Sequence, residues 1–186
     1  MYRNCYWLVL FALIPLSGFN TKSDLYNVKL RAASIDVDKV FLLIDKSDYR
    51  LYLYEDVTLR KIYKVVFGSR DQSDKLVQGD RRTPEGTFRI LSKRVDNRWS
   101  RFLLLDYPNE NSRAKFQHYL AAGKVTANAD MGGGIGIHGV EYGSGIRDNY
   151  VDSRINWTLG CISMKNADVN ELYDILKVGT PVVIRR

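Results

Sequence analysis

One cysteine and one histidine in the second half of the chain have the surroundings of a nucleophile and its base. Cys161 follows Gly160 inside an apolar run, and His138 follows an apolar pair and precedes Gly139. A thiolate is the nucleophilic form of cysteine, and a nearby histidine can take the thiol proton. The flanking glycines allow close backbone approach to a substrate and leave N–H groups to face a developing oxyanion. The pattern indicates covalent catalysis, with an inert core cysteine and a structural histidine as the alternative.

Few other residues could take these two roles. The chain has two histidines, His118 and His138, and two cysteines, Cys5 and Cys161. Cys5 lies in a segment that we expect to be removed on export, which would leave Cys161 as a single free thiol. His118 falls in a segment expected to form an exposed helix, so His138 is the better candidate for the base.

The first residues resemble a targeting segment. Arg3 is basic, and residues 7–16 (WLVLFALIPL) form an apolar run of the length usual in signal peptides. The run is shorter than an ordinary membrane-spanning helix. We therefore expect a signal peptide over residues 1–18 and an exported protein of the periplasm or cell envelope. An uncleaved membrane anchor is the alternative.

The composition is that of a folded domain with excess positive charge. Of the 186 residues, 45% are hydrophobic and 26% are charged, and the net charge is +7. Such a charge suits an anionic membrane or polymer, and for an exported protein we expect no nucleic-acid partner. The basic residues are scattered or paired, as at Arg81 and Arg82, so a solvated surface explains them equally well.

Other chemistries lack their residues. The glycines at 132–136 are not followed by Lys-Ser/Thr, so they do not form a phosphate loop. Two histidines and one remaining cysteine are not spaced as a metal-ligand set, and there is no Gly-x-Ser-x-Gly elbow. We therefore expect no metal and no cofactor.

Strand signals dominate the segments that must position these residues. Runs of β-branched and aromatic residues between turn residues predict strands over residues 40–45, 51–54, 60–67, 87–91, 102–106 and 182–184. Helices are expected over residues 111–122 and 166–176. Strands and helices do not alternate regularly, which argues against a doubly wound parallel sheet. The sequence predicts a mostly β domain over residues 36–186, after a linker over residues 19–35.

The order of the short motifs resembles the L,D-transpeptidase (YkuD-like) family. The motifs that carry the resemblance are Ile137-His138-Gly139, Thr158-Leu159-Gly160-Cys161-Ile162 and Thr83-Pro84-Glu85-Gly86-Thr87-Phe88. Residues 40–54, with an apolar run, an aspartate and then Leu-Tyr-Leu-Tyr, resemble the first hairpin of the family. The closing Gly-Thr-Pro-Val-Val-Ile also fits, so the resemblance covers residues 36–186. It implies a YkuD-type β-sandwich with a few flanking helices.

The resemblance also implies an activity. The chain would be a cysteine-dependent L,D-transpeptidase that acts on peptidoglycan stem peptides through a thioester, in cell-wall biogenesis and cell shape. Cys161 would be the nucleophile and His138 the general base and acid. Thr158 would orient His138, and the backbone N–H groups around Gly160 and Cys161 would stabilise the oxyanion. The acyl group would pass to the amine of an acceptor peptide or protein, or to water.

Three residues are expected to contact the substrate, namely Arg82, Gly139 and Ser163. The guanidinium of Arg82 could bind a stem-peptide carboxylate as a bidentate fork, and a solvated surface turn is the alternative. Leu159 and Ser163 depart from the family pattern Ser/Thr-His-Gly-Cys-hydrophobic-Asn/Arg.

Transfer and hydrolysis both stay open at the level of the sequence. The run Gly79–Gly86 resembles a murein L,D-transpeptidase-like subgroup that includes hydrolytic members. The alternatives are an L,D-specific peptidoglycan hydrolase, which trims stems or releases wall-attached protein, and a non-catalytic wall-binding module. The sequence does not indicate the oligomeric state.

Overall fold

The structure is a computed structural model that describes residues 23–143 and 148–186. The expected signal peptide, residues 1–18, lies outside the described residues. Within them, eight strands form one sheet in the order β3-β2-β1-β8-β4-β5-β6-β7. The strands are β1 (Val40–Asp45), β2 (Arg50–Glu55), β3 (Thr58–Lys64), β4 (Gly86–Asp96), β5 (Ser100–Leu105), β6 (Gly136–His138), β7 (Ile162–Ser163) and β8 (Pro181–Arg185). The helices are α1 (Asp24–Asn27), α2 (Glu110–Ala121), α3 (Asp148–Asp152) and α4 (Asn166–Ile175), with 3-10 turns at Ala32–Ser34 and Val37–Lys39.

The first half of the sheet is a meander completed by the last strand of the chain. β1, β2 and β3 pair antiparallel, and tight turns join them where Tyr49 and Asp56 adopt positive φ. β8 returns between β1 and β4, parallel to β1 and antiparallel to β4. Burial alternates along β1 and β8, as expected for strands with one face on the core.

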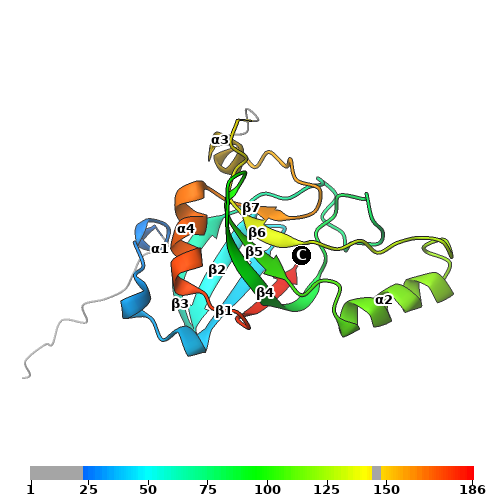
Figure 1. Cartoon of the computed structure of the whole chain (residues 1–186), viewed down its shortest axis with the longest axis horizontal. Coiled ribbons are helices and arrows are strands. Elements are labelled where there is room, and N and C mark those ends of the chain that lie inside the picture. Colours follow the sequence, from blue (N-terminus) through cyan, green and yellow to red (C-terminus); the bar gives the residue numbers. More distant parts are fainter. Residues whose placement is uncertain (1–22, 144–147) are drawn as a thin grey trace, which may run out of the picture.

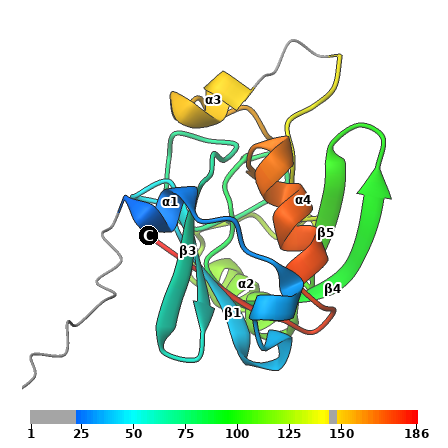
Figure 2. The same ribbon diagram turned by 90° about the vertical axis from the view of Figure 1, so that its left-hand side faces the viewer.

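β4 belongs to both halves of the sheet. Its residues 86–89 pair with β8, and its residues 90–96 pair with β5 after a shift of register between Ile90 and Ser92. Such an irregularity bends a strand and increases its twist. The bend turns the second half, β5-β6-β7, toward the first, and Figure 2 shows the β4–β5 hairpin extending beside α4.

The two halves meet again at the other end of the sheet. Val66, just after β3, exchanges two backbone hydrogen bonds with Ser163 of β7, at 2.8 and 2.9 Å. Side chains of both halves share one core, which includes the fully buried residues Leu42, Leu53, Leu103, Ile137 and Ile162. The expected mostly β fold with flanking helices is confirmed.

The helices contribute unequally to the core. α4 lies against the sheet (Figure 1) and buries Val169, Leu172 and Ile175, which share one face at helical spacing. α2 projects away from the sheet and buries no residue (Figure 1). The segment that we expected to be a linker is described from residue 23 on, and there Leu30 and Ile35 reach the core. None of the described helices has the length and apolar character needed to cross a membrane.

Candidate active site

His138 ends β6 and is held in a fixed orientation by the next residue. Its imidazole is almost fully buried, at 2% exposure, and Nδ1 lies 2.7 Å from the carbonyl oxygen of Gly139. A carbonyl can only accept a hydrogen bond, so Nδ1 carries the proton in the neutral ring. The lone pair of the neutral imidazole is therefore on Nε2, the nitrogen that can act as a base.

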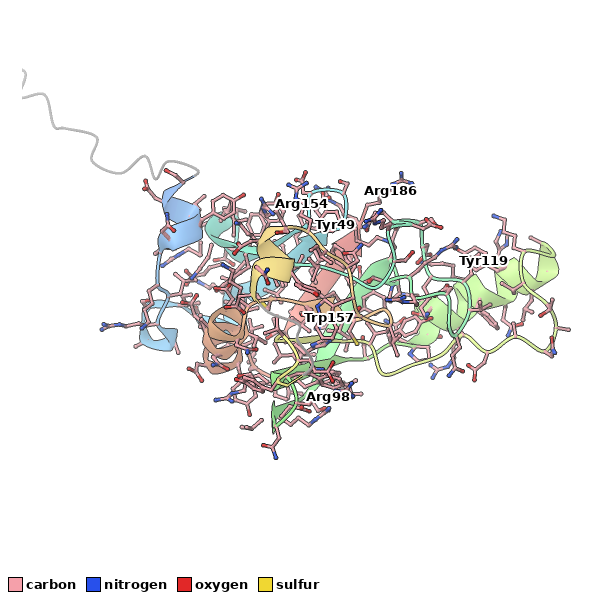
Figure 3. All side chains as sticks on the ribbon, turned by 90° about the horizontal axis from the view of Figure 1, so that it is seen from above. Tyr49, Arg98, Tyr119, Arg154, Trp157 and Arg186 are labelled. Carbon is pink, nitrogen blue, oxygen red and sulfur yellow. The ribbon has the colours of Figure 1, made fainter. Side chains whose placement is uncertain are left out.

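Three aromatic rings surround this imidazole. The ring centroids of Trp99, Phe102 and Trp157 lie 4.8, 5.8 and 5.5 Å from that of His138, and the Phe102 ring is nearly parallel to it, at 7°. Figure 3 places Trp157 toward the middle of the molecule. Burial lowers the pKa of His138 from 6.5 to about 4, although the hydrogen bond to Gly139 opposes this effect. The imidazole is thus neutral, and available as a base, at neutral pH.

Cys161 lies directly before β7, and β7 pairs with β6, the strand that ends at His138. β6 and β7 run parallel, with Ile137 opposite Ile162 and His138 opposite Ser163. Ile137 and Ile162 point into the core, and side chains alternate along a strand. Cys161 and His138 therefore project from the same face of the sheet, away from the core.

The thiol of Cys161 is protonated at rest. Sγ donates to the carbonyl oxygen of Gly134 at 3.6 Å. Burial raises the pKa of the thiol above its ordinary value, and a hydrogen bond from the backbone N–H of Gly136 partly opposes this. A neutral thiol beside a neutral imidazole is a pair that generates the thiolate only when the proton moves to the base.

The turn before Cys161 is closed by Thr158. The Thr158 hydroxyl donates to the carbonyl oxygen of Cys161 at 2.7 Å and accepts the N–H of Gly160 at 3.2 Å. Both partners lie in its own turn, so Thr158 positions the nucleophile, and among the described residues its hydroxyl has no hydrogen bond to His138 that would support the predicted orienting role.

Gly160 gives the turn an unusual backbone conformation. Its φ of +132° is rarely open to other residues, and its N–H is bonded to the Thr158 hydroxyl. The N–H of Cys161 has no acceptor among the described residues and is open to a substrate oxygen. The oxyanion hole formed by the backbone around Gly160 and Cys161 stays a prediction, with the N–H of Cys161 as its better-placed donor.

Gly139 and Ser163 are packed closely around His138. The carbonyl oxygen of Gly139 accepts from His138 and also from the Ser163 hydroxyl, at 3.3 Å. Ser163 lies opposite His138 on β7 and is fully buried, and a Cβ atom on Gly139 would lie 2.0 Å from Oδ1 of Asn166. Both residues therefore hold His138 in place, and their contact with the substrate stays a prediction.

The loop over residues 79–86 is fastened to the turn of Cys161. Thr83 Oγ1 donates to the carbonyl oxygen of Gly160 at 2.9 Å. Arg82 points elsewhere, because its guanidinium pairs with Asp71 at 2.5 Å and reaches the carbonyl oxygen of Asp74 at 3.5 Å. Arg82 therefore braces a neighbouring loop, and this geometry gives no support to the predicted bond between Arg82 and a substrate carboxylate.

Arg81 is a basic residue that contacts the turn of Cys161, and the sequence analysis did not select it. Its Nε and Nη2 donate to the carbonyl oxygens of Thr158 and Trp157, at 3.2 and 3.4 Å. It also lines a pocket of about 360 Å³ together with Leu159, which is 79% exposed. The only signal in the sequence was the pair of adjacent arginines, which does not say which of the two contacts the turn of the nucleophile.

The comparisons with known proteins agree with this fold. The family model of the YkuD L,D-transpeptidase catalytic domain matches residues 39–184. The helical cell shape determining protein Pgp2 from Campylobacter jejuni is 25% identical, with a TM-score of 0.57, over 79% of this chain and 47% of that one. Bd1075 from Bdellovibrio bacteriovorus is 18% identical, with a TM-score of 0.53, over 79% and 48% of the two chains, and shares the fold.

A third solved structure, the Ldtfm-avibactam carbamoyl enzyme, also shares the fold. It is 16% identical, with a TM-score of 0.51, over 80% of this chain and 49% of that one. The chain thus spans about half the length of the solved structures that it matches. No curated protein matches it significantly.

Proposed function

Since the chain belongs to the YkuD family of L,D-transpeptidase catalytic domains, we propose that it acts on peptidoglycan stem peptides with Cys161 as the nucleophile and His138 as the base. The observation that carries the proposal is their placement on one face of the adjacent strands β6 and β7. The hydrogen bond from Nδ1 of His138 to Gly139 leaves Nε2 free to take the thiol proton.

The first step forms an acyl-enzyme. The proton of Cys161 moves to Nε2 of His138 while Sγ bonds to the carbonyl carbon of the donor peptide. The N–H of Cys161 donates to the oxyanion that forms on the carbonyl oxygen. The peptide C–N bond then breaks, and the imidazolium returns its proton to the leaving amine. Because the aromatic rings disfavour the charged ring, they favour this return.

The second step releases the acyl group. An acceptor amine attacks the thioester, and His138 takes a proton from the attacking nitrogen. The imidazolium then gives this proton to the leaving sulfur as the C–S bond breaks, which restores the thiol of Cys161 and the neutral imidazole. Water in place of the amine gives hydrolysis by the same sequence of proton transfers. Leu159 favours this second candidate, because its exposed aliphatic side chain beside the nucleophile offers no hydrogen bond to an acceptor amine.

The proposal includes a cellular role. A protein that acts on stem peptides must reach the cell wall, which agrees with the signal peptide expected over residues 1–18. The relative from Campylobacter jejuni is described as determining helical cell shape. We extend a role in cell-wall biogenesis and cell shape to this chain on that similarity.

The proposal is tested by incubating purified peptidoglycan with the protein and analysing the stems by mass spectrometry. The wild type should yield cross-linked or trimmed stems, and Cys161→Ser should yield neither. His138→Ala should lose at least about 100-fold in rate, whereas His118→Ala, on the exposed surface of α2, should lose little. A carbapenem should add one covalent mass to the wild type and none at position 161 in Cys161→Ser. Activity retained by Cys161→Ser would overturn the mechanism.

A further inference from the structure

The pocket beside Cys161 is lined by cations and apolar groups. Its walls include Arg81 and Lys75 as well as Ile135 and Leu159, and no acidic residue lines it. Gly133 and Ile135 in these walls flank Gly134, whose carbonyl oxygen lies 3.6 Å from Sγ of Cys161. A ligand in this pocket would therefore lie next to the nucleophile.

The two cations of the pocket differ in their partners. Lys75 is buried and ion-paired, since its Nζ lies 2.7 Å from Oδ1 of Asp80 and 3.0 Å from the carbonyl oxygen of Val77. Arg81 is exposed, and no carboxylate among the described residues lies within ion-pair distance of its guanidinium. Its bonds go to two carbonyl oxygens through Nε and Nη2, which leaves Nη1 without a partner in the described part of the chain.

The nearby carboxylates are turned away from Arg81. Asp80 accepts the N–H groups of Leu76, Val77 and Arg82 in addition to the Lys75 ammonium. Arg81 is therefore the cation of this pocket that has no carboxylate partner among the described residues.

The backbone at Arg81 is held in an unusual conformation. Its φ is +58°, a region that costs a residue with a side chain roughly 1 kcal/mol or more relative to glycine. The main chain around it is fastened by Thr83 to Gly160 and by a close approach of Gly68, whose added Cβ would lie 2.4 Å from the Arg81 carbonyl oxygen. A strained arginine that lines a pocket next to the turn of the nucleophile is expected to bind something there.

We propose that Arg81 binds a carboxylate of the acyl-donor peptide in the pocket beside Cys161. This inference rests on the proposed function, which it deepens by assigning the substrate a negative charge close to the bond that is cleaved. A guanidinium presents its N–H donors in a planar fork that matches a carboxylate. Ile135 and Leu159 provide an apolar wall for the aliphatic part of the residue that carries the carboxylate.

The carboxylate has two possible sources, the C-terminus of the stem and an acidic side chain of the stem. Three synthetic stem peptides distinguish them: one with both carboxylates free, one amidated at the C-terminus and one amidated at the side chain. Steady-state kinetics are measured for the wild type, Arg81→Gln and Arg81→Lys. Arg82→Gln is the matched control, because this neighbouring arginine pairs with Asp71 outside the pocket.

The inference predicts that Arg81→Gln raises the KM for the free peptide at least about tenfold, the scale of one charge-assisted hydrogen bond, with little change in kcat. Arg81→Lys should recover part of the loss. Amidation at the carboxylate that Arg81 binds should raise the KM of the wild type similarly and remove the effect of Arg81→Gln. Arg82→Gln should behave like the wild type.

Other results overturn the inference. An equal rise of KM for the free and both amidated peptides in Arg81→Gln means that Arg81 only supports the turn of Cys161. If Arg81→Gln does not fold, equal KM values of the wild type for all three peptides decide against the inference.

Failure of the proposed function itself is recognised separately, by calorimetric titration of Cys161→Ser with the same peptides. Tighter binding of the free peptide without turnover by the wild type supports the pocket and rejects the reaction. Equal affinity for all three peptides, or no binding, rejects the pocket.

Discussion

Lowering the pH from 7 to 5 is expected to destabilise the folded protein through His138. Burial among aromatic rings lowers the pKa of this imidazole from 6.5 to about 4. In the unfolded chain the imidazole binds a proton below about pH 6.5, whereas in the folded chain it stays neutral until about pH 4. The unfolded state holds more protons within this window, so the free energy of unfolding must fall as the pH is lowered through it.

The size of the effect follows from the two pKa values. A difference of one pH unit corresponds to about 1.4 kcal/mol. The drop from 6.5 to about 4 therefore corresponds to about 3 kcal/mol in total. About 2 kcal/mol of this should be lost between pH 7 and pH 5, where the unfolded imidazole becomes almost fully protonated.

The assay is urea unfolding at pH 7, 6 and 5 for the wild type and His138→Asn. Asparagine cannot titrate, and its amide can still donate to the carbonyl oxygen of Gly139. The free energy of unfolding of the wild type should fall by about 2 kcal/mol more than that of His138→Asn. The control His118→Asn, on the exposed surface of α2, should follow the wild type. Parallel curves for the wild type and His138→Asn would refute the reasoning that the aromatic rings keep His138 neutral.

Three substitutions near the nucleophile test the rest of the site. Gly139→Ala places a Cβ 2.0 Å from Oδ1 of Asn166 and should cost about 1–3 kcal/mol of stability, measured by urea unfolding, together with a lower kcat. Thr158→Val removes the donor 2.7 Å from the Cys161 carbonyl oxygen, which should cost about 1–3 kcal/mol and most of the activity, whereas Thr158→Ser should retain both. Leu159→His should change the ratio of cross-linked to trimmed stems, measured by mass spectrometry, and equal ratios would show that Leu159 does not influence the acceptor.

The strands could be predicted from the sequence where one face is buried. Alternating apolar residues gave the limits of β1, β2, β5 and β8 to within two residues. β4 runs on to Asp96, five residues beyond the expected end at residue 91, because the outer part of this strand is largely solvated on both faces and carries polar residues such as Ser92 and Arg94.

The surroundings of the nucleophile could not be predicted in the same way, because they depend on backbone partners. Thr158 and Gly160 were selected for catalysis, but which N–H and carbonyl groups they bind is decided by the turn and leaves no pattern in the sequence. Trp99 contacts His138 only because β5 pairs with β6, and the spacing of the two residues carries no such signal. Arg81 and Arg82 are adjacent, and the positive φ of Arg81 is what separates their directions.

The backbone bridge between Val66 and Ser163 also affects how often the strand next to Cys161 opens locally. β7 has two residues, and it is held by β6 on one side and by the Val66 bridge on the other. So short a strand is expected to open locally more often than the long strands at the centre of the sheet. Each opening would release the strand that follows Cys161 and further expose the half-buried thiol without unfolding the remainder of the chain. In a Cys5→Ser variant, the rate at which a small reagent alkylates Cys161 would therefore measure how often the bridge between Val66 and β7 opens.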